Sequence, residues 1–277
     1  MNLRMPLVAL ATLVFVTLLG GCATPGQPSL EALVASPDRT AADRQNDIRR
    51  KPVDMLAFIA PRPGMVALDL SAGGGYTTEL LARAIGPTGR VYGQSAPRDA
   101  ANPPPRPAVP EGVVAPTTTV ATTRSLSVTA PVRQTVADRA AKPGLSHIVP
   151  VTRRFEDPVP PEVAPGTLDL ATLMFNYHDL SYLGVDRAAM NRAVFTALKP
   201  GGIYVIADHS GRPGTGISEA GTLHRIEEAF LRREIEAAGF RLAASGNFLR
   251  NPTDPRDRNI PEPPQPKDEF VLKFVKP

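Results

Sequence analysis

The chain has 277 residues, 42% of them hydrophobic, which is enough for one large domain or two small ones with a buried core. Its 31 Lys and Arg against 27 Asp and Glu leave a formal net charge of only +4, and basic and acidic residues are intermixed. Proteins that bind nucleic acids usually concentrate basic side chains on one face or offer aromatic platforms for bases. This sequence has neither a dense basic stretch nor a Trp, so we expect no nucleic-acid partner.

The N-terminus is typical of an export signal. Arg4 precedes an apolar run at 5–19, and Gly20 and Gly21 then lead to Cys22, the only cysteine in the sequence. A positive start, a short apolar segment and small residues are the features of a secretory signal peptide. An uncleaved membrane anchor is the alternative, although the run is shorter than the roughly 20 apolar residues of a spanning helix. We therefore expect export, and a single cysteine cannot form an intrachain disulfide.

The position of Cys22, directly after small residues, resembles the lipidation site of a bacterial lipoprotein. The resemblance implies cleavage before Cys22 and a lipid anchor on that residue. Because Ala23 rather than an aspartate follows the cysteine, it also implies a place in the cell envelope at the periplasmic face of the outer membrane.

Composition divides the chain into three parts. Residues 1–21 are the predicted signal peptide, and 22–39, rich in Pro, Gly, Ser and Ala, are a predicted tether. Residues 40–277 are the predicted domain, interrupted at about 95–144 by a Pro-, Ala- and Thr-rich stretch. That stretch has no sustained periodicity, so we expect an irregular insertion.

A strand, a glycine turn and a helix follow one another early in the domain. The apolar run at 65–70 contains Asp69, and three glycines at 73–75 precede an amphipathic helix at 77–86. Glycine lacks a Cβ atom, so its backbone can lie against a ligand, and a helix N-terminus presents free N–H groups. The dinucleotide fingerprint G-x-G-x-x-G is incomplete, because Thr78 takes its third glycine position. The segment still predicts a cofactor-binding turn.

The rest of the domain continues this alternation. After a strand at about 89–93, apolar runs predict strands at 147–155, 166–175, 203–210, 240–250 and 268–277. Helical spacing predicts helices at 40–60, 182–198 and 222–238, with a tight turn at 199–202. Alternating strands and helices predict an α/β fold with a mainly parallel sheet, helices on both faces and two closing strands.

The motif D-x-S-x-G-G-G-Y at 69–76 resembles the first motif of class I S-adenosylmethionine (SAM)-dependent methyltransferases, in which an acid precedes a G-x-G-x-G turn. The turn L-K-P-G-G before a buried strand is a further feature of that family. Together, GGGY, NYHD, ADHS and LHRI resemble a group of bacterial predicted methyltransferases. The resemblance covers about residues 45–275 apart from the insertion. It implies a Rossmann-like three-layer sandwich, one antiparallel closing strand and SAM as the cofactor.

The resemblance also implies which residues contact the cofactor. Two positions depart from the family: Ser71 replaces a glycine, and Gln94 stands where an acid usually holds the ribose. Asn176 and Tyr177 occupy the place where the family's fourth-strand motif faces the methyl donor. The candidate cofactor-binding residues are Asp69, Ser71, Gly73, Gly74, Gly75, Tyr76, Gln94, Asn176 and Tyr177.

Histidines and aspartates follow two of the predicted strands. His178 and Asp179 come after the strand at 166–175, Asp208 and His209 end the next strand, and His224 follows. Ligands of open α/β sheets bind beyond the carboxyl ends of the strands. Methyl transfer to an O–H or N–H group needs a base, and histidine suits that role near neutral pH. We predict His178, or else His209, as the base, with Asp179 or Asp208 orienting the imidazole.

Three functional hypotheses follow. The first is a lipid-anchored SAM-dependent methyltransferase that acts on a small molecule or an envelope component. The second is a ligand-binding protein on a methyltransferase scaffold that has lost catalysis, motivated by Ser71, Gln94 and export away from the compartment where SAM is made. The third is a metal-assisted hydrolase that uses the histidines and aspartates after the strands. Because no His-x-x-x-His pair is present, the spacing assigns no metal site.

Overall fold

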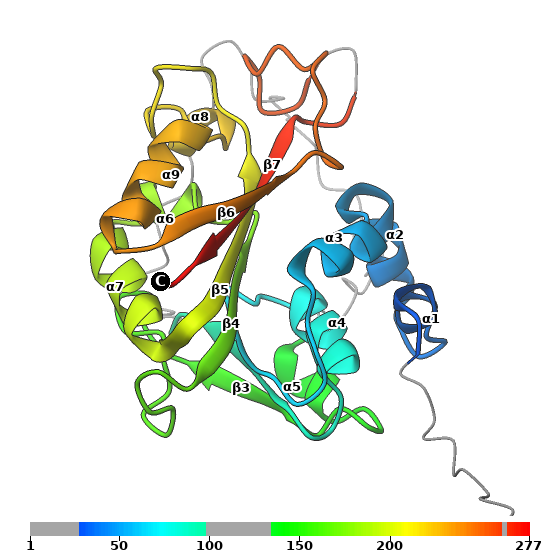
Figure 1. The fold of residues 1–277 in the computed structure, drawn as a ribbon. Helices are drawn as coiled ribbons and strands as arrows, with labels where there is room; N and C mark the ends of the chain where they lie inside the picture. Colours follow the sequence, from blue (N-terminus) through cyan, green and yellow to red (C-terminus); the bar gives the residue numbers. More distant parts are fainter. Residues whose placement is uncertain (1–27, 98–133, 262–264) are drawn as a thin grey trace, which may run out of the picture.

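The computed structural model describes residues 28–97, 134–261 and 265–277, which form a seven-stranded sheet covered by helices (Figure 1). The predicted signal peptide, Cys22 and most of the predicted insertion lie outside the described residues. The strands are β1 (Val66–Leu70), β2 (Arg90–Ser95), β3 (Ile148–Thr152), β4 (Leu168–Met174), β5 (Leu198–His209), β6 (Arg241–Gly246) and β7 (Glu269–Val275). Their order across the sheet is β3-β2-β1-β4-β5-β7-β6.

Neighbouring strands from β3 to β5 are parallel, whereas β7 runs antiparallel to both β5 and β6. The predicted mainly parallel sheet with one closing antiparallel strand is therefore confirmed. The central strands β1 and β4 are almost entirely buried. A strand covered on both faces reads as a continuous apolar run instead of an alternating one, as these two do.

Helices cover the two faces of the sheet, and the sheet separates two apolar layers. They are α1 (Leu30–Val34), α2 (Ala41–Arg50), α3 (Pro52–Ile59), α4 (Tyr76–Ile85), α5 (Val136–Ala140), α6 (Asp179–Tyr182), α7 (Arg187–Ala197), α8 (Ala220–Leu223) and α9 (Glu228–Ala237). In Figure 1 the helices α1 to α4 lie on one side of the sheet and α6 to α9 on the other. Apolar side chains of α3, α4 and α5 share one buried cluster, and those of α7 and α9 share the other. Within the described residues no helix is both long and apolar enough to cross a membrane.

The predicted helix at 40–60 is two helices. Thr40 and Asp43 form a capping box that starts α2, since each side chain accepts a hydrogen bond from the other's backbone N–H. Lys51 then adopts a left-handed conformation with φ of 43°, and Pro52 begins α3. The first N–H groups of a helix have no partner within it, so a proline at the first helical position loses no hydrogen bond. Pro52 can therefore begin α3 directly after the end of α2.

Two boundaries of the predicted domain differ from the structure. The predicted tether contains α1, whose Leu33 is buried in the apolar layer beside α3 and α4. Residues 134–144, predicted as part of the insertion, include α5, which Thr135 and Asp138 cap. Both segments are too short for a clear helical period, so composition alone misled the prediction.

The predicted helix at 222–238 is also interrupted. His224 is left-handed with φ of 52°, Ile226 forms a parallel bridge with Ser210, and α9 begins only at Glu228. Arg225 explains the interruption, because its fully buried guanidinium pairs with Asp254 and donates to the carbonyl of Ser210. Residues 199–202, predicted as a tight turn, belong to β5. They lie where the pairing of β5 with β4 shifts register, between Leu198 and Ile203.

Candidate functional site

An open cleft of about 710 Å³ lies at the carboxyl ends of β1 and β4, the edge that the strand topology predicts for a ligand. Residues from α2, the glycine turn, the start of α5 and the end of β4 form its walls. They are Thr40, Ala42, Asp43, Asn46, Arg50, Asp69, Leu70, Ser71, Ala72, Gly73, Gly74, Tyr76, Thr77, Gln134, Thr135, Arg139, Met174, Phe175 and Asn176. Six of the nine predicted cofactor-binding residues are among them. We refer to this space as the cofactor cleft.

Asp69 lies at the floor of the cofactor cleft near the end of β1. Its two carboxylate oxygens accept hydrogen bonds from the hydroxyls of Thr78, at 2.6 Å, and Thr172, at 2.7 Å. Burial outweighs these bonds and raises the pKa of Asp69 to about 6. The carboxyl group is therefore held rigidly and titrates close to neutral pH.

The turn after β1 depends on left-handed backbone. Ser71, Gly73 and Gly75 have φ values of 54°, 54° and 73°. Ser71 thus adopts a backbone conformation that glycine takes more easily. Its hydroxyl donates a hydrogen bond to the side-chain oxygen of Asn176. At Gly75 a Cβ atom would lie 2.8 Å from Cδ of Arg139, so that glycine is needed for close packing as well as for its backbone conformation.

Arg139 of α5 forms hydrogen bonds that connect the glycine turn with α2 and α4. Its guanidinium donates to the carbonyl of Gly74, to Glu79 and, at 2.7 Å, to Asp43. The side chains of Arg139, Asp43 and Glu79 are all buried. The arginine outweighs the effect of burial on Asp43 and lowers the pKa of that carboxyl to about 2. This three-way ion pair connects segments on both sides of residues 98–133.

Arg50 brings a positive charge into the cofactor cleft. Its guanidinium carbon lies 5.0 Å from the ring centre of Tyr76 and 4.9 Å from that of Phe175. Burial and the neighbouring Arg49 lower the pKa of Arg50, and its Nε atom has no hydrogen-bond partner among the described residues. Arg50 is not among the predicted cofactor-binding residues, because two adjacent arginines at a helix end give no signal of which one faces the cleft.

Three predicted cofactor-binding residues do not reach the cleft. Gln94 is fully buried, and its amide accepts from the backbone N–H of Ser71 and donates to the carbonyl of Arg153. Tyr177 is also fully buried, with its hydroxyl bonded to Glu234 and Asn191. Gly75 faces Arg139. The polar groups of Gln94 and Tyr177 therefore bond within the fold, and neither residue lines the cleft.

The histidines and aspartates after β4 and β5 meet as one cluster. His178 is buried, and its ring nitrogen Nδ1 lies 2.6 Å from Oδ1 of Asp208, while Nε2 lies 3.0 Å from Oδ1 of Asp179. Burial alone would lower the pKa of His178, but the two carboxylates outweigh it and raise the pKa to about 10. In the absence of another cation, His178 carries both ring protons at neutral pH and is not a free base.

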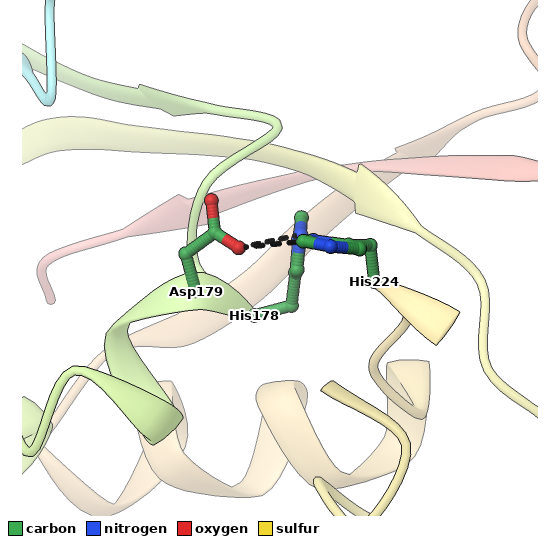
Figure 2. Close-up of side chains that lie close together, drawn as sticks. All are labelled: His178, Asp179 and His224. Atoms are coloured by element: carbon green, nitrogen blue, oxygen red, sulfur yellow. Dashed lines mark hydrogen bonds and ion pairs between the residues drawn. The ribbon is translucent and has the colours of Figure 1, made fainter. Parts of the chain in front are cut away.

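His224 also belongs to this cluster, and Figure 2 shows its imidazole and that of His178 on the same side of the Asp179 carboxylate. Its Nδ1 atom lies 3.3 Å from Oδ1 of Asp179. Burial and the charge of His178 lower the pKa of His224, so its ring is neutral. Asp179 also accepts a hydrogen bond from the side-chain amide of Asn176, which lines the cofactor cleft. The cluster is therefore continuous with the cleft wall.

His209 is the least suited of the predicted catalytic residues. Its ring contacts those of His178 and Phe175, with centroids 5.4 Å and 5.7 Å away. Burial lowers the pKa of His209 well below its usual value, and Nδ1 approaches Glu269 at 2.9 Å without hydrogen-bond geometry. His209 therefore packs behind His178 as a neutral ring.

The fold is similar to that of solved structures described as SAM-dependent methyltransferases. A chain of the complex between the Haloferax volcanii Trm112 methyltransferase activator and a methyltransferase superposes with a TM-score of 0.52 and 17% identity, covering 90% of this chain and 97% of that one. An arsenic(III) SAM methyltransferase from Chlamydomonas reinhardtii superposes with a TM-score of 0.51 and 15% identity. The match covers 90% of this chain and 73% of that one.

A third similar structure is the [4+2]-cyclase SpnF, with a TM-score of 0.51, 17% identity, and 86% of this chain and 81% of that chain covered. At such identities the similarity shows the fold alone, and the cyclase illustrates that one fold serves different reactions. No protein-family model matches the sequence, and no curated protein matches it significantly.

Proposed function

We propose that this protein is a SAM-dependent methyltransferase that acts on a small molecule or an envelope component. The observation that carries the proposal is the cofactor cleft, where a glycine turn, the Asp69 carboxyl and the Arg50 guanidinium meet at the carboxyl ends of β1 and β4. The methyltransferase-like fold supports the same reading.

The polar groups of the cleft suit the parts of SAM. The unpartnered Nε of Arg50 is a donor for the methionine carboxylate, and Asp69 offers a negative charge for the positive end of the cofactor. Gly73 and Gly74 present backbone without side chains, so a ligand can approach closely. Bound SAM would supply a methyl group on a positively charged sulfur.

Gln134 is a candidate for the adenosine end. The family's ribose-binding acid is absent at residue 94, and Gln94 is occupied within the fold. Gln134 lines the cleft, and its buried Oε1 atom has no hydrogen-bond partner among the described residues. An unsatisfied buried acceptor costs free energy, which a ribose hydroxyl or an amino group of the cofactor would offset.

The histidine cluster is the proposed acceptor side of the reaction. Asn176 belongs to the cleft wall and bonds Asp179, so a substrate bound at the cluster would lie beside the methyl donor. Holding donor and acceptor in line is the main task of such an enzyme. We propose that Asp179 and His178, positioned by Asp208, orient the acceptor, with His209 packing behind them.

Calorimetric titration of the full-length chain with SAM and S-adenosylhomocysteine tests cofactor binding. A mild detergent keeps the apolar N-terminus in solution. We expect micromolar binding that Arg50→Gln weakens by about 10-fold or more, because a charge-assisted hydrogen bond contributes roughly 1.5–3 kcal/mol. Arg44→Gln is the matched control, since Arg44 lies on the same helix and donates to the carbonyl of Ser36 outside the cleft. Absence of binding to the folded parent would overturn the proposal.

A ligand-binding protein without catalysis is the second candidate. The missing acid at residue 94 and the strained Ser71 favour it. Incubation with methyl-labelled SAM and an envelope extract separates the two: transfer of label supports the enzyme, whereas tight SAM binding without any transfer supports the binding protein.

We further propose that the chain is exported and anchored in the cell envelope by a lipid on Cys22. The support is the sequence alone: an apolar run, small residues and one cysteine. Labelling with a radioactive fatty acid in a bacterial host tests this. The parent should take up label and Cys22→Ser should not, and an unlabelled parent in the soluble fraction would contradict the proposal.

A further inference from the structure

We propose that His178, Asp179 and His224 form a binding site for a divalent first-row transition-metal ion. One ligand atom from each of these residues lies within 4.8 Å of the others, and Figure 2 shows all three side chains turned toward a common point. Two imidazoles and one carboxylate are a ligand set suited to iron, zinc, cobalt or manganese. This site does not depend on SAM binding.

The separations of the Asp179 carboxylate from the two imidazoles fit one ion. Atoms that each lie about 2.1 Å from a metal, at angles of about 90–110°, are roughly 3.0–3.4 Å apart. Asp179 Oδ1 lies 3.0 Å from Nε2 of His178 and 3.3 Å from Nδ1 of His224. The ligand atoms of all three residues, including the two imidazoles, lie within 4.8 Å of one another.

Asp208 supplies the outer partner that metal-binding histidines usually have. Its Oδ1 atom accepts from Nδ1 of His178 at 2.6 Å, and its Oδ2 atom accepts from the backbone N–H of His178 at 2.8 Å. This arrangement fixes the ring and leaves Nε2 to face Asp179 and His224. A carboxylate behind a histidine ligand orients the ring and strengthens the metal bond.

The carboxylate of Asp179 is fixed in a similar way. Its Oδ2 atom accepts from Asn176, and the hydroxyl of Tyr182 donates to Oδ1 at 2.8 Å. The exposed fractions are 20% for the Asp179 side chain and 25% for that of His224, against 3% for His178. An ion held here would therefore be reachable from solvent, with coordination positions left open.

The charges favour a cation at this point. Asp179 and Asp208 place a carboxylate at each ring nitrogen of His178, 3.0 Å from Nε2 and 2.6 Å from Nδ1. An ion at the proposed site would therefore have one carboxylate among its ligands and a second carboxylate behind the His178 ring.

Where the proposed methyl transfer holds, the same site has a chemical role. An ion with open positions lowers the pKa of a bound hydroxyl group and fixes its orientation. An acceptor with an ionisable oxygen, such as a phenol or a hydroxy acid, would then bind at the cluster beside Asn176. This last step rests on the proposed function, whereas the metal site itself does not.

Titration of the full-length chain with Co²⁺, after removal of bound metals by a chelator, tests the site. We expect one equivalent to bind with micromolar affinity and to give visible absorption bands that Zn²⁺ abolishes by competition. His224→Gln should weaken binding by about 10-fold or more. His147→Gln is the control, because His147 is the remaining histidine and bonds the carbonyl of Ala82 elsewhere in the fold.

Saturable binding that is lost in His224→Gln and retained in His147→Gln would support the site. The partly exposed side chain of His224 makes that variant safe for folding, and circular dichroism checks it. No one-to-one binding by the folded parent, or equal binding by His224→Gln, would overturn the proposal. SAM titration without metal gives a separate result, so failure of one proposal is distinguishable from failure of the other.

Discussion

Nδ1 of His178 lies 2.6 Å from Oδ1 of Asp208, and this contact joins the ends of the neighbouring strands β4 and β5. Asp208 is fully buried and also accepts from the backbone N–H groups of His178 and His209. One carboxylate therefore sets both the course of the chain after β4 and the orientation of the His178 ring. The ring nitrogen Nε2 is left to face Asp179.

Asp208→Asn should weaken Co²⁺ binding by about 10–100-fold, the usual effect of changing the outer partner of a histidine ligand. Asparagine has the same shape and keeps one acceptor for the backbone, so the fold should persist. Calorimetry with Co²⁺ measures the effect, and the near-ultraviolet dichroism spectrum checks the packing. Parent-like affinity in a folded variant would assign Asp208 a purely structural role.

Arg139→Met should destabilise the protein by about 3–5 kcal/mol, because it leaves the buried Asp43 without its arginine and takes from the buried Glu79 one of three basic partners. Urea unfolding followed by circular dichroism gives the change in the free energy of unfolding. Arg154→Met is the matched control, since it removes an exposed ion pair with Glu156 and should cost less than about 1 kcal/mol. Equal losses in the two variants would show that burial adds nothing to the Arg139 network.

Much of the fold is readable from the sequence because the central strands are buried on both faces. The apolar runs at 65–70 and 166–175 and the glycine turn between strand and helix have little structural ambiguity. The interrupted helix near residue 225 has no such signal. Its apolar spacing fits a helix, and the groups that pair with Arg225 in the interior, Asp254 and the carbonyl of Ser210, are distant in sequence.

The candidate site likewise has residues whose role the sequence predicts and residues whose role it does not. Asp69 and the glycines are local features, so their role follows from adjacent residues. The meeting of His178 with His224 depends on how α6 and α8 pack, and the roles of Arg50 and Gln134 depend on contacts across the cleft. Gln94 and Tyr177 have suitable chemistry, but their partners in the folded chain, Arg153 and Glu234, are distant in sequence.

Gly75→Ala should destabilise the protein more than Gly73→Ala. Both glycines have positive φ, so alanine costs about 1–2 kcal/mol at either position for the backbone alone. A Cβ atom at residue 75 would also lie 2.8 Å from Arg139, whereas at residue 73 its nearest neighbour is 3.9 Å away. Thermal unfolding of both variants measures the difference. Equal melting temperatures would mean that Arg139 moves aside without cost.

SAM affinity should rise with pH between about 5 and 7, because burial raises the pKa of Asp69 from 3.8 to about 6. SAM has a positive sulfur that S-adenosylhomocysteine lacks, so the ionised carboxylate should favour SAM. If only the ionised form binds well, affinity at pH 5 is about 10-fold below that at pH 7. Calorimetry at several pH values measures the profile, and Asp69→Asn should bind weakly with a flat profile.

The same pKa predicts the opposite trend for folding, which separates binding from stability. A raised carboxyl pKa means that the folded state binds the proton more tightly than the unfolded chain between about pH 4 and 6. The contribution of Asp69 to the free energy of unfolding therefore falls as the pH rises through this window. Weak SAM binding at pH 5 cannot then come from unfolding through Asp69, and an unchanged pH profile in Asp69→Asn would assign the effect to another group.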